Sequence, residues 1–182
     1  MPDLLLFKFV GVPLFVIFVI IENIIFLKKN IKPDLIYRLV FYSFFIYFLL
    51  ILKLTFFPLP IGKDPIIDLQ MMALQNNFVP FKGIFKHNEF AFYPVIENIA
   101  LLFPLGIYLP LLFKRKGFGF VLIIGLITTV GIESMQFIIS SIIGVTYRTT
   151  DINDVIFNTL GLIIGYMVFR LINPLLQASK VK

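Results

Sequence analysis

The chain has 182 residues, of which 59% are hydrophobic and 14% are charged, and it carries a net charge of +6 at pH 7. Soluble globular domains contain about 25% charged residues, so this composition excludes a soluble domain and predicts a protein of the lipid bilayer. Cysteine is absent, which excludes disulfides, cysteine nucleophiles, thiolate metal sites and iron–sulfur clusters.

Five apolar segments are long enough to cross a membrane, which takes about 20 helical residues at about 1.5 Å each. They cover residues 4–27, 35–57, 94–113, 118–140 and 154–173. The first segment follows Asp3 and lacks a small-residue cleavage site, so we expect it to stay as a helix and not to be a removable signal peptide. The predicted fold is an all-α polytopic helical membrane protein, a single domain over residues 1–182, with an extracytoplasmic loop between helices 2 and 3.

Basic residues follow every second segment, and the positive-inside rule places such connections in the cytoplasm. They are Lys28, Lys29 and Lys32, then Lys114, Arg115 and Lys116, and finally Arg170, Lys180 and Lys182. The rule predicts the N-terminus outside and the C-terminus inside. Abundant Phe, Ile, Lys and Asn without Trp favour a bacterial source. The predicted location is therefore the bacterial cytoplasmic membrane.

The loop over residues 58–93 is longer than the other connections and lies outside in this topology. Residues 66–75 have the pattern of a short amphipathic helix at the membrane interface, where it would form a lid. Pro80, with Phe78 and Phe81, either plugs the mouth of the bundle or meets an acyl chain, or anchors the loop at the interface. Aromatic residues gather at membrane interfaces, which favours the anchor. The sole histidine, His87, has no partner pattern that predicts catalysis.

Seven polar residues in and beside the last three segments form the candidate substrate-binding site. They are Asn98, Glu133, Gln136, Arg148, Asp151, Asp154 and Asn158. The predicted topology brings all of them toward the outer leaflet. An ionised carboxylate at membrane depth is costly unless it is paired or hydrated, so these groups are expected to face the bundle interior or a wet cavity, with Arg148 as the counter-ion.

Spacing places several of these residues on shared helix faces, because Glu133 and Gln136 are three residues apart and Asp154 and Asn158 are four apart. A structural alternative makes Asp151 the N-cap of the last helix, with Asp154 at N3 in a capping-box-like arrangement. Capping leaves Asn158, Glu133 and Gln136 unexplained. The joint pattern therefore favours a site.

Four short blocks occur in order within residues 77–166. They are Asn77–Phe81, Glu97–Ile99 leading to Phe103–Gly106, Ile132–Gln136, and Asp151–Asp154 followed by Asn158–Gly161. In these blocks the chain resembles the VanZ-like membrane proteins associated with glycopeptide resistance, named for a factor that lowers teicoplanin susceptibility. Leu162 departs from the second glycine usual in that family, and residues before 58 match in hydropathy only. Gly161 and Gly165 form a small-xxx-small pair that permits close helix packing.

Two function classes remain open, and the resemblance favours the first, a binding or shielding factor at the outer leaflet. Its ligand would be an amphiphilic lipoglycopeptide antibiotic or a lipid-linked wall precursor. Arg148 would pair with a phosphate or carboxylate through its bidentate fork. Asn98, Gln136 and Asn158 would supply amide hydrogen bonds. No pattern for nucleic acid, nucleotide or zinc binding occurs, no resident cofactor is expected, and the sequence does not indicate an oligomeric state.

The second class is an integral-membrane enzyme acting on a lipid-linked or phosphorylated envelope substrate. Carboxylates gathered in a low dielectric acquire proton affinities suited to acid–base catalysis, with Glu133 as general base and Asp151 and Asp154 as further candidates. Under this alternative Asp151 and Asp154 would instead hold Mg²⁺. A proton-coupled transporter ranks last, because the inner halves of the segments offer few polar groups.

Overall fold

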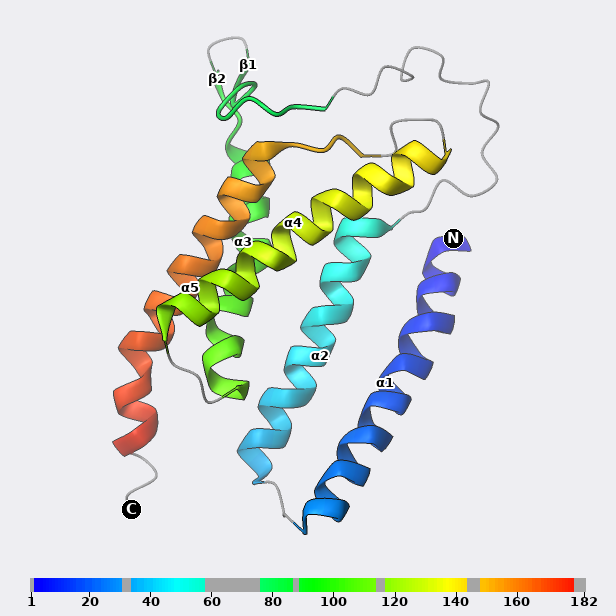
Figure 1. Cartoon of the computed structure of the whole chain (residues 1–182), viewed down its shortest axis with the longest axis vertical. Coiled ribbons are helices and arrows are strands. Elements are labelled where there is room, and N and C mark those ends of the chain that lie inside the picture. Colours follow the sequence, from blue (N-terminus) through cyan, green and yellow to red (C-terminus); the bar gives the residue numbers. More distant parts are fainter. Residues whose placement is uncertain are drawn as a thin grey trace. The chain divides into compact units, whose positions relative to one another are not determined.

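A computed structural model of the chain describes residues 2–30, 34–57, 76–86, 89–113, 117–143 and 148–178. Five helices occur in these ranges (Figure 1). They are α1 (Pro2–Lys29), α2 (Leu35–Phe56), α3 (Phe92–Leu112), α4 (Phe118–Ile143) and α5 (Ile152–Ala178). Each is long and apolar enough to cross a membrane. The prediction of an all-α, multi-pass membrane protein is confirmed, and each helix lies where the hydropathy placed it.

The chain divides into two compact units, Met1–Leu59 and Pro60–Lys182, each described here by itself. The first unit holds α1 and α2, and the second holds α3, α4 and α5. The single domain predicted over residues 1–182 stays a prediction. The amphipathic helix predicted at 66–75 and the side chain of His87 lie outside the described residues.

Aromatic rings fill the space between α1 and α2. Phe18 stacks on Phe41 at a centroid distance of 4.6 Å and lies 4.2 Å from Phe45, which also contacts Phe15 at 5.4 Å. Glu22 is buried among these helices, and the hydroxyl of Tyr42 donates a 3.0 Å hydrogen bond to its Oε2. The two helices thus pack through aromatic contacts with one buried polar link.

Glycines bring α3 and α5 into close contact along their lengths (Figure 1). A Cβ atom at Gly161 would collide with the carbonyl oxygen of Ile99, and one at Gly165 with that of Phe103. Gly106 on α3 meets the backbone of α5 at Tyr166 in the same way. The predicted role of Gly161 and Gly165 in close helix packing is confirmed.

The side chain of Leu162 on α5 fits against α4 because α4 has a glycine, Gly125, opposite it. The side chain of Leu162 is fully buried, and a Cβ atom at Gly125 would overlap its Cδ2. The larger residue at 162 is therefore accommodated by the missing side chain at 125.

Gly125→Ala is expected to destabilise the protein by about 1–3 kcal/mol, the usual cost of overpacking. Combining it with Leu162→Ala should cost less than the sum of the two single changes, because the added methyl then enters the space that Leu162 leaves. Denaturant unfolding of the purified protein in detergent measures all three variants. Gly131→Ala is the matched control, because an added Cβ there meets none of the described residues within 4 Å apart from its own helix backbone. Strictly additive effects would contradict the proposed contact.

The segment before α3 forms a tight turn and a small hairpin. The amide of Lys82 donates to the carbonyl of Val79 at 3.2 Å, and Phe81 in this turn has φ +63°. The two-residue strands β1 (Phe85–Lys86) and β2 (Glu89–Phe90) follow and pair antiparallel. This segment carries the chain to the end of the second unit where α3 and α5 begin.

Candidate functional site

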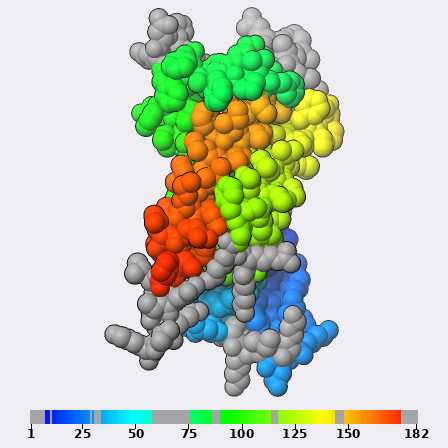
Figure 2. All heavy atoms as spheres, turned by 60° about the vertical axis from the view of Figure 1, so that its left-hand side comes forward, coloured from blue at the N-terminus to red at the C-terminus, as the bar shows by residue number. Residues whose placement is uncertain are grey.

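The turn before α3 docks on the chain that enters α5. Asn77 forms a parallel bridge with Asp151, in which the Asn77 amide donates to Thr150 O and the Ile152 amide donates to Asn77 O, both at 2.9 Å. Figure 2 shows the turn and the start of α3 in green lying over the orange start of α5. Residues far apart in the sequence therefore meet at the start of α5.

Asp151 caps the N-terminus of α5. Its Oδ1 accepts hydrogen bonds from the backbone amide of Asn153 and from Nδ2 of Asn77, both at 2.8 Å. A carboxylate at this position satisfies an amide that has no partner within the helix and complements the helix dipole. The predicted cap is confirmed, and the same carboxylate also holds the turn before α3.

The capping box predicted from Asp154 is wrong. Asp154 Oδ1 accepts instead from Nδ2 of Asn98 on α3 at 2.6 Å. The amide of Asp151, which a capping box would satisfy from N3, donates to Oε2 of Glu133 on α4 at 3.1 Å. Glu133 is only 6% exposed, and the amide of Asp151 supplies its buried carboxylate with a hydrogen-bond donor. Glu133 therefore helps to cap α5. The sequence had instead suggested that capping leaves Glu133 unexplained.

Asn153 holds the turn before α3 from the other side. Its Oδ1 accepts from the amide of Phe81 at 2.6 Å, and its Nδ2 donates to the carbonyl of Lys82 at 2.9 Å. Phe81 at positive φ is a costly conformation for a bulky residue, and this contact maintains it. We call Asn77, Asn98, Glu133, Asp151, Asn153 and Asp154 the polar junction. Sequence reasoning did not select Asn77 or Asn153, although both lie in the four blocks.

Three carboxyl groups of the polar junction, those of Glu133, Asp151 and Asp154, lie within electrostatic range of one another. The charge of Arg148 acts on Asp154 with the opposite sign. The role of Arg148 as the counter-ion stays a prediction. Ser140 on α4 fixes the backbone of Arg148, because its hydroxyl donates to Arg148 O at 3.3 Å. The polar junction thus gathers three acids near one base at the edge of an apolar bundle.

Two further candidate residues are buried amides. Asn158 is 1% exposed, and its Nδ2 donates to Oγ1 of Thr129 at 3.1 Å, while its Oδ1 has no hydrogen-bond partner among the described residues. Gln136 is 6% exposed on the same face of α4 as Glu133. A buried carbonyl oxygen without a donor is costly in a bilayer, so Asn158 Oδ1 is an acceptor whose donor is not among the described residues.

The family model described as VanZ/LLP1 matches residues 44–173 of the chain. The chain belongs to the VanZ/LLP1 family. The match covers all of the polar junction and begins within α2, so it extends further toward the N-terminus than the four sequence blocks indicated. Searches among curated proteins and among solved structures found no match.

Exposed aromatic side chains occur in the turn and hairpin before α3 of this VanZ/LLP1 protein, and the turn contacts the polar junction. Phe78 is 68% exposed, Phe81 56% and Phe85 63%, and Phe90 lies beside Phe85 with their ring centroids 5.7 Å apart. The roles expected for Phe78 and Phe81, as a plug of the bundle or as an anchor at the interface, stay predictions. The exposed rings offer an apolar surface next to buried polar groups.

Asp151 and Asp154 carry carboxylate oxygens, which are ligands that Mg²⁺ accepts. In the part of the chain that the structure describes, no group of three or more His, Cys, Asp or Glu residues is arranged to hold a metal ion. The Oδ1 atoms of both aspartates are engaged by asparagine side chains. Asp151 and Asp154 therefore accept hydrogen bonds from amide groups in this structure.

Proposed function

We propose that this VanZ/LLP1 membrane protein binds or shields an amphiphilic envelope molecule at the outer face of a bacterial cytoplasmic membrane, and thereby acts as a glycopeptide (teicoplanin) resistance factor. One observation carries the proposal. Around the start of α5, buried Glu133 and Asn153 and half-buried Asp151 and Asp154 contact one another or the turn that carries the exposed rings of Phe78 and Phe81. An amphiphile has the same division, a polar head and an apolar tail, and can satisfy both surfaces at once.

The outer location rests on charge. The basic residues of the short connections lie at or after the ends of α1 and α3. The others lie at Arg170 and after it, toward the end of α5. The positive-inside rule assigns those ends to the cytoplasm. The polar junction lies at the opposite ends, where α3 and α5 begin, and therefore faces the side on which wall precursors and glycopeptides occur.

Arg148 is the residue that we expect to contact the head group of the ligand. Its guanidinium forms bidentate, charge-assisted hydrogen bonds with a phosphate or carboxylate. Asn158 Oδ1 would accept from a hydroxyl or amide of the ligand, and Asn98 and Gln136 would add amide contacts. The acids of the polar junction would orient Arg148 and accept from ligand hydroxyls.

An enzyme acting on a lipid-linked or phosphorylated envelope substrate is the second candidate. The three carboxyl groups within electrostatic range of one another favour it, because sites of acid–base catalysis often gather acidic groups in this way. Glu133 would be the general base, and Mg²⁺ at Asp151 and Asp154 belongs to this alternative. Glu133→Gln separates the two candidates. It keeps an oxygen that accepts from the Asp151 amide but removes the base, so a binder retains function and an enzyme loses it.

The test is glycopeptide susceptibility in a sensitive host that expresses the protein. Wild type is expected to raise the inhibitory concentration of teicoplanin, which carries an acyl chain, more than that of vancomycin, which does not. Arg148→Ala should lower affinity about tenfold or more through loss of a charge-assisted hydrogen bond, and protection should fall accordingly. Asp154→Asn and Asn158→Ala are expected to weaken it as well.

Arg170→Ala is the matched control, since Arg170 is an exposed arginine toward the other end of α5. Membrane expression of each variant is measured by blotting so that loss of protein is not read as loss of function. Failure of wild type to protect against either antibiotic would overturn the resistance proposal and leave the enzyme as the better candidate. Equal protection by wild type and Arg148→Ala would show that Arg148 is not the head-group contact.

A further inference from the structure

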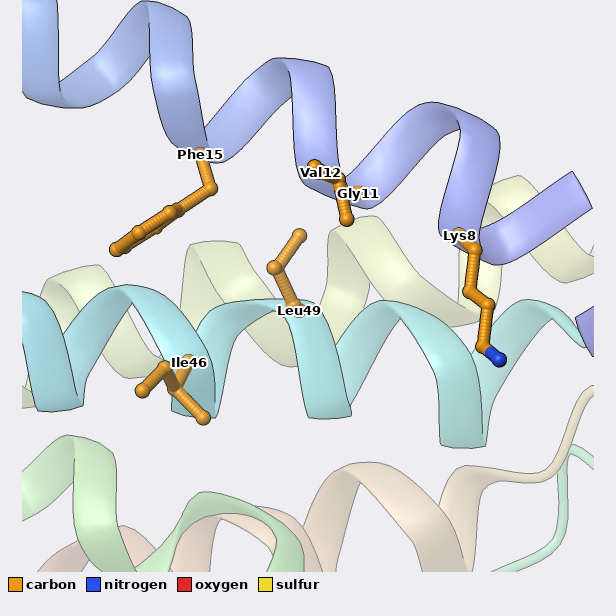
Figure 3. Close-up of a pocket in the computed structure, with 6 residues that line it drawn as sticks. All are labelled: Lys8, Gly11, Val12, Phe15, Ile46 and Leu49. Carbon is orange, nitrogen blue, oxygen red and sulfur yellow. The ribbon is translucent and has the colours of Figure 1, made fainter. Parts of the chain in front are cut away.

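A groove opens between α1 and α2 in the first unit. It has a volume of about 280 Å³ and is lined by Lys8, Gly11, Val12 and Phe15 from α1 and by Ile46 and Leu49 from α2 (Figure 3). Apart from the ammonium of Lys8, every lining side chain is apolar. Val12 is 60% exposed and Ile46 is 54% exposed, so the groove is open on the surface of the hairpin.

The groove follows from the sequence of the hairpin. Further along α1, rings from both helices fill the interface, as the 4.2 Å centroid distance between Phe18 and Phe45 shows. Gly11 contributes no side chain, and Phe15 closes the groove at that end. The helices therefore leave an open groove between them that begins where the aromatic packing stops and runs about 10 Å along α1 from Phe15 to Lys8.

Lys8 gives the groove a charge at one end. Its side chain extends from α1 toward α2 at the end of the hairpin where α1 begins (Figure 3). Among the described side chains of this unit, the acidic ones are Glu22 and Asp34. Glu22 lies 14 residues further along α1, a distance of about 21 Å, and accepts a hydrogen bond from Tyr42. Neither of these two acids therefore lies beside Lys8, since Asp34 precedes α2 at the other end of the hairpin.

An apolar groove with a cation at its end matches a lipid that has an acyl chain and an anionic head group. We propose that the groove holds one acyl chain of an anionic phospholipid, whose phosphate pairs with the ammonium of Lys8. The acyl chain contacts Val12, Phe15, Ile46 and Leu49 in place of the side chain that Gly11 lacks. The lysine stem lies along the apolar surface while its charge reaches the head-group level. This lipid site lies outside the polar junction and does not depend on the proposed resistance function.

The absence of tryptophan from the chain allows a direct test. Ile46→Trp places a single fluorescent reporter in the groove, and Ile17→Trp places one at a comparably exposed position of α1 that does not line it. Each protein is reconstituted in phosphatidylcholine with increasing fractions of phosphatidylglycerol that carries brominated acyl chains, which quench tryptophan. A parallel series uses brominated phosphatidylcholine.

The groove reporter is expected to reach half-maximal quenching at about a fivefold lower fraction of brominated phosphatidylglycerol than of brominated phosphatidylcholine, the effect of one lysine near a membrane surface. The Ile17→Trp reporter should respond equally to both lipids. Lys8→Gln in the Ile46→Trp background should remove the preference, and Lys8→Arg should keep it.

Equal quenching of the groove reporter by both lipids would overturn the proposal, as would a preference that survives Lys8→Gln. A groove reporter that neither lipid quenches would mean that protein covers the groove, either a second copy or another part of the chain, and would also overturn it. Circular dichroism of each variant confirms that the helices are retained, so a changed preference is assigned to Lys8.

Discussion

Gly161→Leu is expected to unfold the second unit or to destabilise it by at least about 3 kcal/mol. The added side chain would meet the carbonyl oxygen of Ile99, which belongs to the backbone of α3 and cannot rotate away as a side chain can. Relief requires α3 and α5 to separate, and this separation also breaks the hydrogen bond between Asn98 and Asp154. Denaturant titration of the purified protein in detergent measures the loss.

Gly131→Leu is the control for this change, since Gly131 is also a helical glycine, on α4. Apart from its own helix backbone, none of the described residues lies within 4 Å of an added Cβ there. It is expected to change the free energy of unfolding by less than about 1 kcal/mol, close to the intrinsic difference between glycine and leucine in a helix. Similar losses for the two variants would refute the view that close backbone contact between α3 and α5 holds the unit together.

Asp151→Ala is expected to cost roughly 2–4 kcal/mol in the free energy of unfolding. Loss of the N-cap accounts for about 0.5–2 kcal/mol. The remainder comes from Asn77 Nδ2, which loses the carboxylate it now contacts at 2.8 Å. The turn over residues 76–82 should also detach from α5. Hydrogen–deuterium exchange of the 76–82 amides measures this detachment separately from global unfolding.

Asp151→Asn distinguishes capping from charge, because an asparagine oxygen still accepts from the amide of Asn153. It should restore most of the stability and most of the protection of residues 76–82. Glu97→Ala, which removes an exposed acid from α3, is the matched control and should leave both unchanged. If Asp151→Ala leaves exchange at 76–82 unaltered, the turn is held by contacts other than this carboxylate.

The helices were predictable because membrane crossing imposes a length and a hydropathy that a sequence displays directly. The ends of the helices were less predictable, since α5 begins at Ile152 and not at residue 154. The hydropathy pattern omits the polar first turn, which belongs to the helix because Asp151 caps it. The close contact of α3 and α5 was indicated by Gly161 and Gly165, but its partners Ile99 and Phe103 were not.

The candidate site was predictable in composition but not in pairing. Asn98, Glu133, Asp151 and Asp154 do come together, as convergence of three helix ends implied. The choice of partner depends on tertiary distance, so the structural alternative that used local spacing to place Asp154 in a capping box was wrong. Asn153 was overlooked because asparagine next to a helix start is common, and its contacts with Phe81 and Lys82 cross more than seventy residues.

The hydrogen bond from the amide of Asp151 to Glu133 has a consequence for how the protein is made. Synthesis delivers α4 to the membrane before α5, so the carboxylate that completes the start of α5 is already in place when that helix arrives. The first turn of α5 is then set by its neighbour as well as by its own residues. Insertion of α5 ahead of α4, as in a chain with the two helices permuted, would leave that turn incomplete.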